Sequence, residues 1–346
     1  MSSRRRQGAQ SQHYVPKFIL RQFLSNAEKQ HVSVFHKSKK NGFTTSIDKI
    51  MTERRFYEFA IGDNYIASFE DGVGKIEDDL LPFYRQVLDE RCLRSTDMQR
   101  AGLSLFMAFQ QLRTRRQRDQ FQELESLLEA KLAEMGGKLT DLENWEELTE
   151  DSLRQHHIEF MRSNIGDFAK VIAEKDFLLL EAPPGRSFYL GDNPVALHND
   201  TEPDNPMFGS LGFAVTGIQI YLPLSSDLML AAFCPTILQT IQERTQYSLE
   251  NAENMAVAGV REGLISAIKA KEHLEHIRRL LQPATELANA FETGMPLRLP
   301  NKVMDFCNSL QLVFARDFVV CAQGDFKLAR KMSKLNPKTC ASVAQA

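Results

Sequence analysis

The sequence lacks long apolar runs, has few cysteines and carries little net charge. No stretch approaches 18 consecutive apolar residues, so no membrane-spanning helix is expected. The polar residues 7–12 follow a basic start, which argues against a secretory signal peptide. Its five cysteines lie far apart among 346 residues without zinc-ligand spacing, and the formal net charge is −3. We therefore expect a cytoplasmic protein that does not associate with membranes and has no molecule-wide basic field.

Standard catalytic motifs are also missing. The sequence contains no phosphate-binding Gly-rich loop, no G-x-S-x-G elbow, no H-E-x-x-H helix and no dinucleotide fingerprint. These absences argue against the common cofactor enzymes. What remains is a set of polar residues at positions where folding alone does not require them.

The spacing of apolar residues predicts a helix-rich α+β fold. With 43% hydrophobic residues, the chain can bury a sizeable core. Short apolar runs separated by Pro and Gly predict one mainly antiparallel sheet within 176–233, and the tail offers strand candidates at 311–315 and 318–321. Apolar residues at three- and four-residue spacing predict helices at 76–92, 97–117 and 152–173.

The chain divides into three segments by composition. Residues 1–11 are small, polar and basic, which predicts a disordered basic arm. Residues 12–275 carry the helical and strand patterns of a single α+β domain. Residues 276–346 have apolar runs too short for a separate core, so we expect a C-terminal extension packed on that domain.

Several short motifs occur in a characteristic order over residues 12–275. Together they resemble the family called domain of unknown function 4238. The sequence departs from the family pattern at Gly191, where Ser or Thr is more usual, and in a long helical insertion near 120–150. The motifs are His13-x-Val15-Pro16-x-x-x-Leu20-x-x-Phe23, Phe56-Tyr57, Leu112-Arg113-Thr114, Gly191-Asp192-Asn193-Pro194-Val195, the strand 218–224 and Asn254 at the start of a helix.

Three residues of these motifs are candidates for catalysis, and each has a structural alternative. His13 titrates near neutral pH, which suits an acid, a base or a metal ligand, although it can equally orient the first helix. Arg113 ends an apolar helix and binds either a buried carboxylate or an anionic ligand. Asp192 leaves a strand beside a Pro turn, where it either serves a site or stabilises the turn. We expect these three side chains to meet at one junction of sheet and helix.

Other polar residues surround this predicted site. Glu70, Glu77 and Asp78 complement the dipole of the helix near residue 76, or hold a divalent metal ion together with Asp192. The candidates for substrate binding are Arg21, Asn193 and Asn254.

Two functions remain open from the sequence, one catalytic and one not. The first is a nuclease or other phosphoester hydrolase of a phage-defence or toxin system, which would act on nucleic acid or nucleotides with or without a metal ion. The second is a non-catalytic protein that binds a ligand or partner, with the polar residues forming a structural network. In that case the 120–150 insertion is the expected surface for a protein partner or a second copy.

Overall fold

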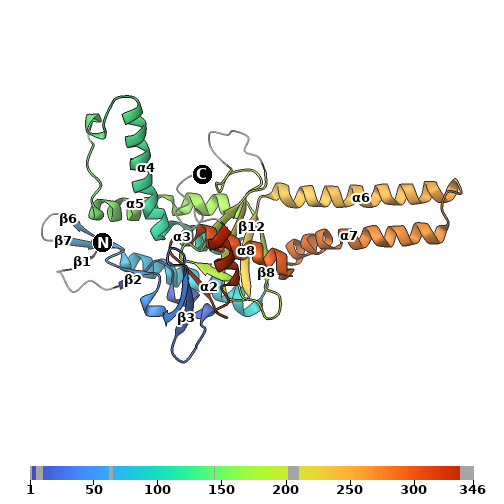
Figure 1. The fold of residues 1–346 in the computed structure, drawn as a ribbon, viewed down its shortest axis with the longest axis horizontal. Helices are drawn as coiled ribbons and strands as arrows, with labels where there is room; N and C mark the ends of the chain where they lie inside the picture. Colours follow the sequence, from blue (N-terminus) through green and yellow to red (C-terminus); the bar gives the residue numbers. More distant parts are fainter. Residues whose placement is uncertain (1, 5–10, 62–64, 144, 202–209, 336–346) are drawn as a thin grey trace.

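Helices and strands alternate along the described part of the chain, which the computed structural model gives as residues 2–4, 11–61, 65–143, 145–201 and 210–335. The α+β class expected from the sequence is confirmed (Figure 1). The helices are α1 (Lys17–Leu20), α2 (Glu70–Glu90), α3 (Asp97–Leu112), α4 (Arg115–Glu134), α5 (Glu150–Ala173), α6 (Pro235–Arg261), α7 (Ala267–Thr293), α8 (Asn301–Phe314) and α9 (Lys327–Leu335), with 3-10 turns η1 (Arg21–Phe23), η2 (Ile47–Lys49) and η3 (Leu139–Asp141).

The strands of the described residues fall into four sheets, so the expectation of one mainly antiparallel sheet is too simple. The largest has the order β10-β11-β12-β8-β13, and a second has the order β4-β3-β14-β9. The strands are β1 (Ser2–Arg4), β2 (Ser11–His13), β3 (His31–His36), β4 (Asn41–Ser46), β5 (Thr52–Arg54), β6 (Glu58–Ile61), β7 (Tyr65–Ser68), β8 (Asp176–Glu181), β9 (Tyr189–Gly191), β10 (Ala196–His198), β11 (Gln219–Pro223), β12 (Leu228–Phe233), β13 (Leu297–Arg298) and β14 (Phe318–Cys321).

The two larger sheets meet at the chain between β9 and β10. β9 pairs with β14 from the far end of the sequence, whereas β10 pairs with β11. The two strands are separated only by residues 192–195, so this short connection passes from one sheet to the other. The predicted site residue Asp192 therefore lies between two sheets.

A layer of three helices, α2, α3 and α5, lies near the positions that apolar spacing predicts, but α2 begins six residues before the predicted start at 76, and the predicted helix 97–117 is divided between α3 and α4. The Thr96 side chain caps α3 by accepting from the Gln99 N–H at 3.2 Å. This helix ends at Leu112 because Thr114 caps the next helix, α4. A Cβ on Gly102 would lie 2.4 Å from the Phe83 ring, so only glycine permits the observed approach of α2 to α3.

The C-terminal part of the chain joins the same sheets. The predicted boundary at residue 275 falls inside α7, while β13 pairs with β8 and β14 lies between β3 and β9. The strand candidate 318–321 is confirmed as β14. The candidate at 311–315 is wrong, because residues up to Phe314 belong to α8.

The N-terminal arm is described only in part. Ser2–Arg4 form β1, which pairs with β7, where the composition predicts disorder. Residues 1 and 5–10 of the predicted arm lie outside the described residues.

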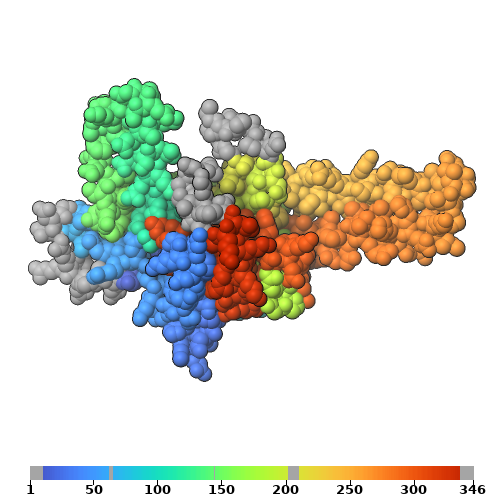
Figure 2. All heavy atoms as spheres, in the orientation of Figure 1, coloured from blue at the N-terminus to red at the C-terminus, as the bar shows by residue number. Residues whose placement is uncertain are grey.

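Two helical hairpins project from the body of the molecule in different directions. Figure 1 shows α4 rising on one side and the long pair α6–α7 extending to another, and Figure 2 shows both as separate protrusions. Each helix of the longer pair has 27 residues. Within the described chain, no helix combines the length and apolarity needed to cross a lipid bilayer.

Candidate functional site

His13 ends β2, and its side chain is bound to the backbone of a neighbouring turn. Nε2 lies 2.9 Å from the carbonyl oxygen of Ile47, so this nitrogen carries the proton and donates it. Burial lowers the pKa of His13 below its ordinary value. The His13 carbonyl oxygen accepts from the Tyr57 hydroxyl at 3.2 Å and from Arg113 at 2.9 Å. The backbone of His13, not its ring, therefore meets Arg113.

Arg113 is the C-cap residue of α3, and its side chain is only 1% exposed. Nε donates to the Tyr57 hydroxyl at 3.1 Å, Nη1 to Glu77 Oε1 at 2.6 Å and Nη2 to the His13 carbonyl at 2.9 Å. Phe109 stacks against the guanidinium at 4.6 Å. Burial alone would lower the pKa of Arg113, but Tyr57 and Glu77 raise it above its ordinary value. The carboxylate that balances this buried charge is Glu77, not Asp192.

Asp192 follows β9, is 2% exposed, and binds the backbone that leads into β14. Oδ1 accepts from the Arg316 N–H at 2.6 Å, while Oδ2 accepts from Asp317 at 2.8 Å and Phe318 at 3.1 Å. Burial raises the pKa of Asp192 to about 6, against the opposing effect of these N–H donors. Both carboxylate oxygens are thus used to fix the loop between α8 and β14.

The turn that contains Asp192 is held from two sides. The Thr114 hydroxyl donates to Asn193 Oδ1 at 3.0 Å. On the other side, Gln311 of α8 accepts from the Gly191 N–H and donates to the Pro194 carbonyl, both at 2.9 Å. A Cβ on Gly191 would lie 3.0 Å from the Gln311 carbonyl oxygen, which accounts for glycine at this position of the chain.

These contacts connect four predicted site residues in one network. Arg113 is hydrogen-bonded to His13, and its chain neighbour Thr114 is hydrogen-bonded to Asn193. Asn193 is in turn the chain neighbour of Asp192. Gln12, a buried residue that the sequence analysis did not identify, also belongs to this network: it accepts from the Tyr57 N–H at 2.7 Å and donates to Glu58 and Glu70. A glutamine in a polar N-terminal stretch gives no signal of burial.

Two other predicted residues lie outside the network. Asn254 is exposed in the middle of α6, which begins at Pro235, so the expectation that Asn254 opens a helix is wrong. Arg21 is exposed in η1 and lines a pocket. Among the described residues, no group of three or more His, Cys, Asp or Glu side chains is placed to hold a metal ion.

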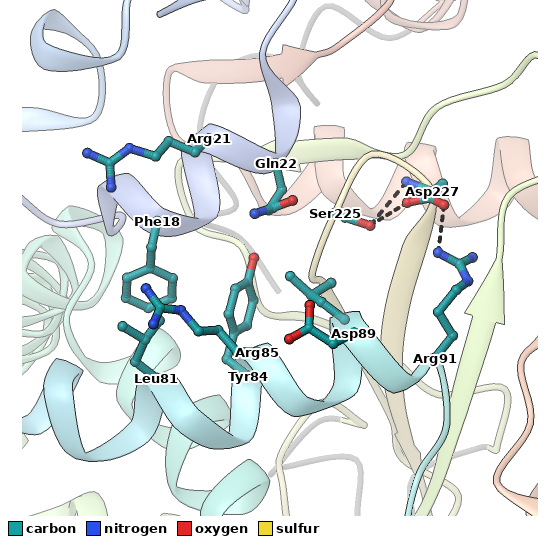
Figure 3. Close-up of a pocket in the computed structure, with 11 residues that line it drawn as sticks. Phe18, Arg21, Gln22, Leu81, Tyr84, Arg85, Asp89, Arg91, Ser225 and Asp227 are labelled. Atoms are coloured by element: carbon teal, nitrogen blue, oxygen red, sulfur yellow. Dashed lines mark hydrogen bonds and ion pairs between the residues drawn. The ribbon is translucent and has the colours of Figure 1, made fainter. Parts of the chain in front are cut away.

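The pocket that Arg21 lines has a volume of about 520 Å³ and lies between η1 and α2 (Figure 3). Phe18 and Tyr84 form part of its wall, with ring centres 5.0 Å apart. Its lining residues are Phe18, Arg21, Gln22, Leu81, Tyr84, Arg85, Leu88, Asp89, Arg91, Ser225 and Asp227.

The charged groups of this pocket differ in how they are engaged. Arg91 pairs with Asp227 and Glu181, each at 2.8 Å. Arg21 and Arg85 have no side-chain hydrogen bond or ion pair within the described part of the chain, and both are exposed. In Figure 3 their guanidinium groups lie toward the same end of the view, and the Arg91–Asp227 pair lies toward the other.

The fold and these contacts define an α+β protein in which a buried polar network joins the helical layer to two sheets. Beside it lies a pocket whose Arg21 and Arg85 have no side-chain partner within the described segments. The chain belongs to the family described as Protein of unknown function (DUF4238), which matches residues 11–325. The resemblance expected from the sequence is thereby confirmed, and the match extends beyond residue 275 to include β14. No curated protein and no solved structure matches the chain.

Proposed function

We propose that this protein is a non-catalytic ligand-binding protein that takes a small phosphorylated molecule of the nucleotide class in the pocket between η1 and α2. The observation that carries the proposal is the pair Arg21 and Arg85, two cations that line one pocket and have no side-chain partner among the described residues. Arg21 is also the predicted substrate-binding residue of the N-terminal motif.

The contacts of the three catalytic candidates support binding over hydrolysis. Arg113 and Asp192 are almost fully buried, and their charged groups are engaged by Glu77 and by backbone N–H groups. The Nε2 of His13 is engaged by a carbonyl. A nuclease or phosphoester hydrolase needs groups that are free to bind the phosphate, deprotonate water or hold a metal ion. These three side chains instead stabilise the junction of sheets and helices.

The chemistry of the pocket favours an anion with polar groups at its other end. Guanidinium groups bind phosphate through two parallel N–H donors, so Arg21 and Arg85 suit a phosphate group. The ring of Phe18 and the side chain of Leu81 offer apolar contact to a planar body. Asp89, one turn after Arg85 on α2, has no partner within the described chain and accepts hydrogen bonds from hydroxyl or amino groups. A volume of about 520 Å³ is within the usual range for small-molecule sites.

Isothermal titration calorimetry and thermal-shift measurements test this proposal with nucleoside mono-, di- and triphosphates and their unphosphorylated nucleosides. We expect saturable binding of phosphorylated compounds only, and a loss of roughly tenfold or more in affinity for the variant Arg21→Gln/Arg85→Gln. Arg244→Gln, an exposed arginine on α6, is the matched control and should bind as the wild type does.

Two outcomes would overturn the proposal. Binding of no phosphorylated compound, or equal binding by the double variant, would remove the pocket as the site. Release of phosphate or nucleoside that is lost on Asp192→Asn would instead establish the phosphoester hydrolase.

A further inference from the structure

The hairpin that begins with α4 carries an apolar stripe that no element of the described chain covers. Four large side chains, at three- and four-residue spacing or one heptad apart, lie along one face of this helix. Their exposed fractions are 65% for Leu124, 62% for Leu127, 44% for Leu128 and 84% for Met135. A helix in a globular protein normally buries such a stripe, so this face is expected to meet another surface.

The surroundings of this stripe are strongly acidic. Between residues 123 and 151 the sequence has ten acidic and two basic residues, a net charge of −8. One of the two, Lys131, lies within the stripe and pairs with Glu134 at 2.8 Å. We call residues 123–151 the acidic hairpin. A surface that fits it must combine apolar side chains with positive charge.

The tip of the α6–α7 pair has that combination. Val257, Leu264 and Ile268 are 68%, 74% and 73% exposed. From 257 to 271 the sequence has three basic residues and one acidic residue, a net charge of +2, and two of the cations also form exposed ion pairs, Arg261 with Glu262 at 3.8 Å and Lys271 with Glu275 at 3.9 Å. We call residues 257–271 the basic tip. Its apolar side chains are expected to pack on the leucines of the acidic hairpin, with the lysines and arginine facing carboxylates.

The two surfaces of one molecule cannot meet each other. Figure 1 shows the acidic hairpin and the α6–α7 pair projecting from different sides of the body, and Figure 2 shows them as separate protrusions that point in different directions. The complement of each surface is therefore supplied by a second copy. Because the two surfaces differ, the contact is heterologous and leaves one free surface of each kind at the ends of an assembly.

We infer that the protein associates head to tail with copies of itself, the basic tip of one copy docking on the leucine stripe of the acidic hairpin of the next. The charges make this association dependent on ionic strength. The fraction of protein in the assembly grows with protein concentration.

Analytical ultracentrifugation of the full chain over a range of protein and salt concentrations tests this inference. The wild type should form species larger than a monomer, and salt should dissociate them. Leu264→Glu/Ile268→Glu places charges on the apolar surface of the basic tip, and Leu124→Lys/Leu127→Lys does the same to the leucine stripe. Each variant alone should therefore remain monomeric. Mixed in equal amounts, the two variants should form a 1:1 dimer and nothing larger, because each retains the surface that the other lacks.

Tyr247→Glu, at a 71% exposed position on α6 outside the tip, is the matched control and should associate as the wild type does. Circular dichroism establishes that every variant is folded. A wild type that is monomeric at all concentrations in low salt would overturn the inference. So would single-surface variants that still associate alone, a mixture that stays monomeric, or an equal loss of association in Tyr247→Glu.

Discussion

The guanidinium of Arg113 donates to the carbonyl oxygen of His13 at 2.9 Å, across 100 positions of sequence. The same guanidinium donates to Glu77 and Tyr57, so one buried cation ties β2 to both α2 and the segment before β6. A side chain with this many buried partners is a strong determinant of stability. The contact also explains how two family motifs meet without forming a reactive pair of side chains.

Replacing Arg113 with Met should lower the free energy of unfolding by about 3–5 kcal/mol. The change leaves the Glu77 carboxylate without its ion-pair partner, and the His13 carbonyl keeps only the Tyr57 hydroxyl as a donor. Urea denaturation measures the loss. Arg94→Met is the control, because Arg94 is 58% exposed and pairs with Glu90 at the surface, so its removal should cost under about 1 kcal/mol. Equal stabilities of the two variants would contradict a structural role for Arg113.

Asp192→Asn should lower the free energy of unfolding by about 1–3 kcal/mol. The amide has one oxygen in place of two, so at least one of the N–H groups of Arg316, Asp317 and Phe318 then faces an N–H donor. Chemical denaturation gives the change, and Asp200→Asn, 79% exposed, is the control with little expected effect. An unaltered stability of Asp192→Asn would show that this carboxylate serves something other than the loop.

His157 should make the protein less stable as the pH falls from about 6.5 to 4. Burial lowers the pKa of His157 to about 4, and its Nε2 donates to the Leu112 carbonyl at 2.7 Å. The unfolded chain, whose His pKa is about 6.5, binds the proton more readily over this range, so acid favours unfolding by up to about 3 kcal/mol. Above pH 6.5 the effect is absent. The raised pKa of Asp192 acts oppositely in part of this range, so wild type and variant are compared at each pH.

The variant for this test is His157→Gln, whose amide still donates to a carbonyl but does not titrate. Its stability should fall less on acidification than that of the wild type. His156→Gln alters the exposed neighbour and should retain the wild-type pH dependence. Identical pH profiles for His157→Gln and the wild type would refute the assignment.

Gly102→Ala should destabilise the protein by about 1–3 kcal/mol, although alanine is the better helix former. Its Cβ would meet the Phe83 ring at 2.4 Å. Gly166→Ala in α5 is the matched control: nothing lies within 4 Å of its Cβ, so it should stabilise the helix by about 1 kcal/mol. Thermal melts show whether each alanine raises or lowers the melting temperature. Adding Phe83→Leu to Gly102→Ala should restore part of the lost stability. Stabilisation by both alanines would contradict the close packing of α2 on α3.

Helix positions could be predicted because their signals are local. Apolar spacing and the cap at Thr96 lie within the helices themselves, and α3 and α5 follow them closely. The division of strands between sheets depends on pairings such as Val320 with Leu190, across 130 positions, which neither segment encodes alone. The one-sheet expectation was wrong for this reason.

The site could be predicted only in part, for a related reason. An arginine at the end of an apolar helix needs a partner, and this identified Arg113, but several acidic residues were equally eligible until the fold selected Glu77. The partners of Asp192 are backbone N–H groups, which every residue except proline provides. No residue type in the sequence marks such a contact.

The long pair α6–α7 is inserted between β12 and β13, which flank the same strand, β8. With 27 residues in each helix, the pair is about 40 Å long. A sideways force at its far end therefore acts on the body of the molecule through a long lever arm. α6 follows β12 and α7 leads into β13, and these two strands pair with the two edges of β8, so both ends of the arm are anchored beside one strand. A force at the far end of the arm therefore acts on β8 from both of its edges.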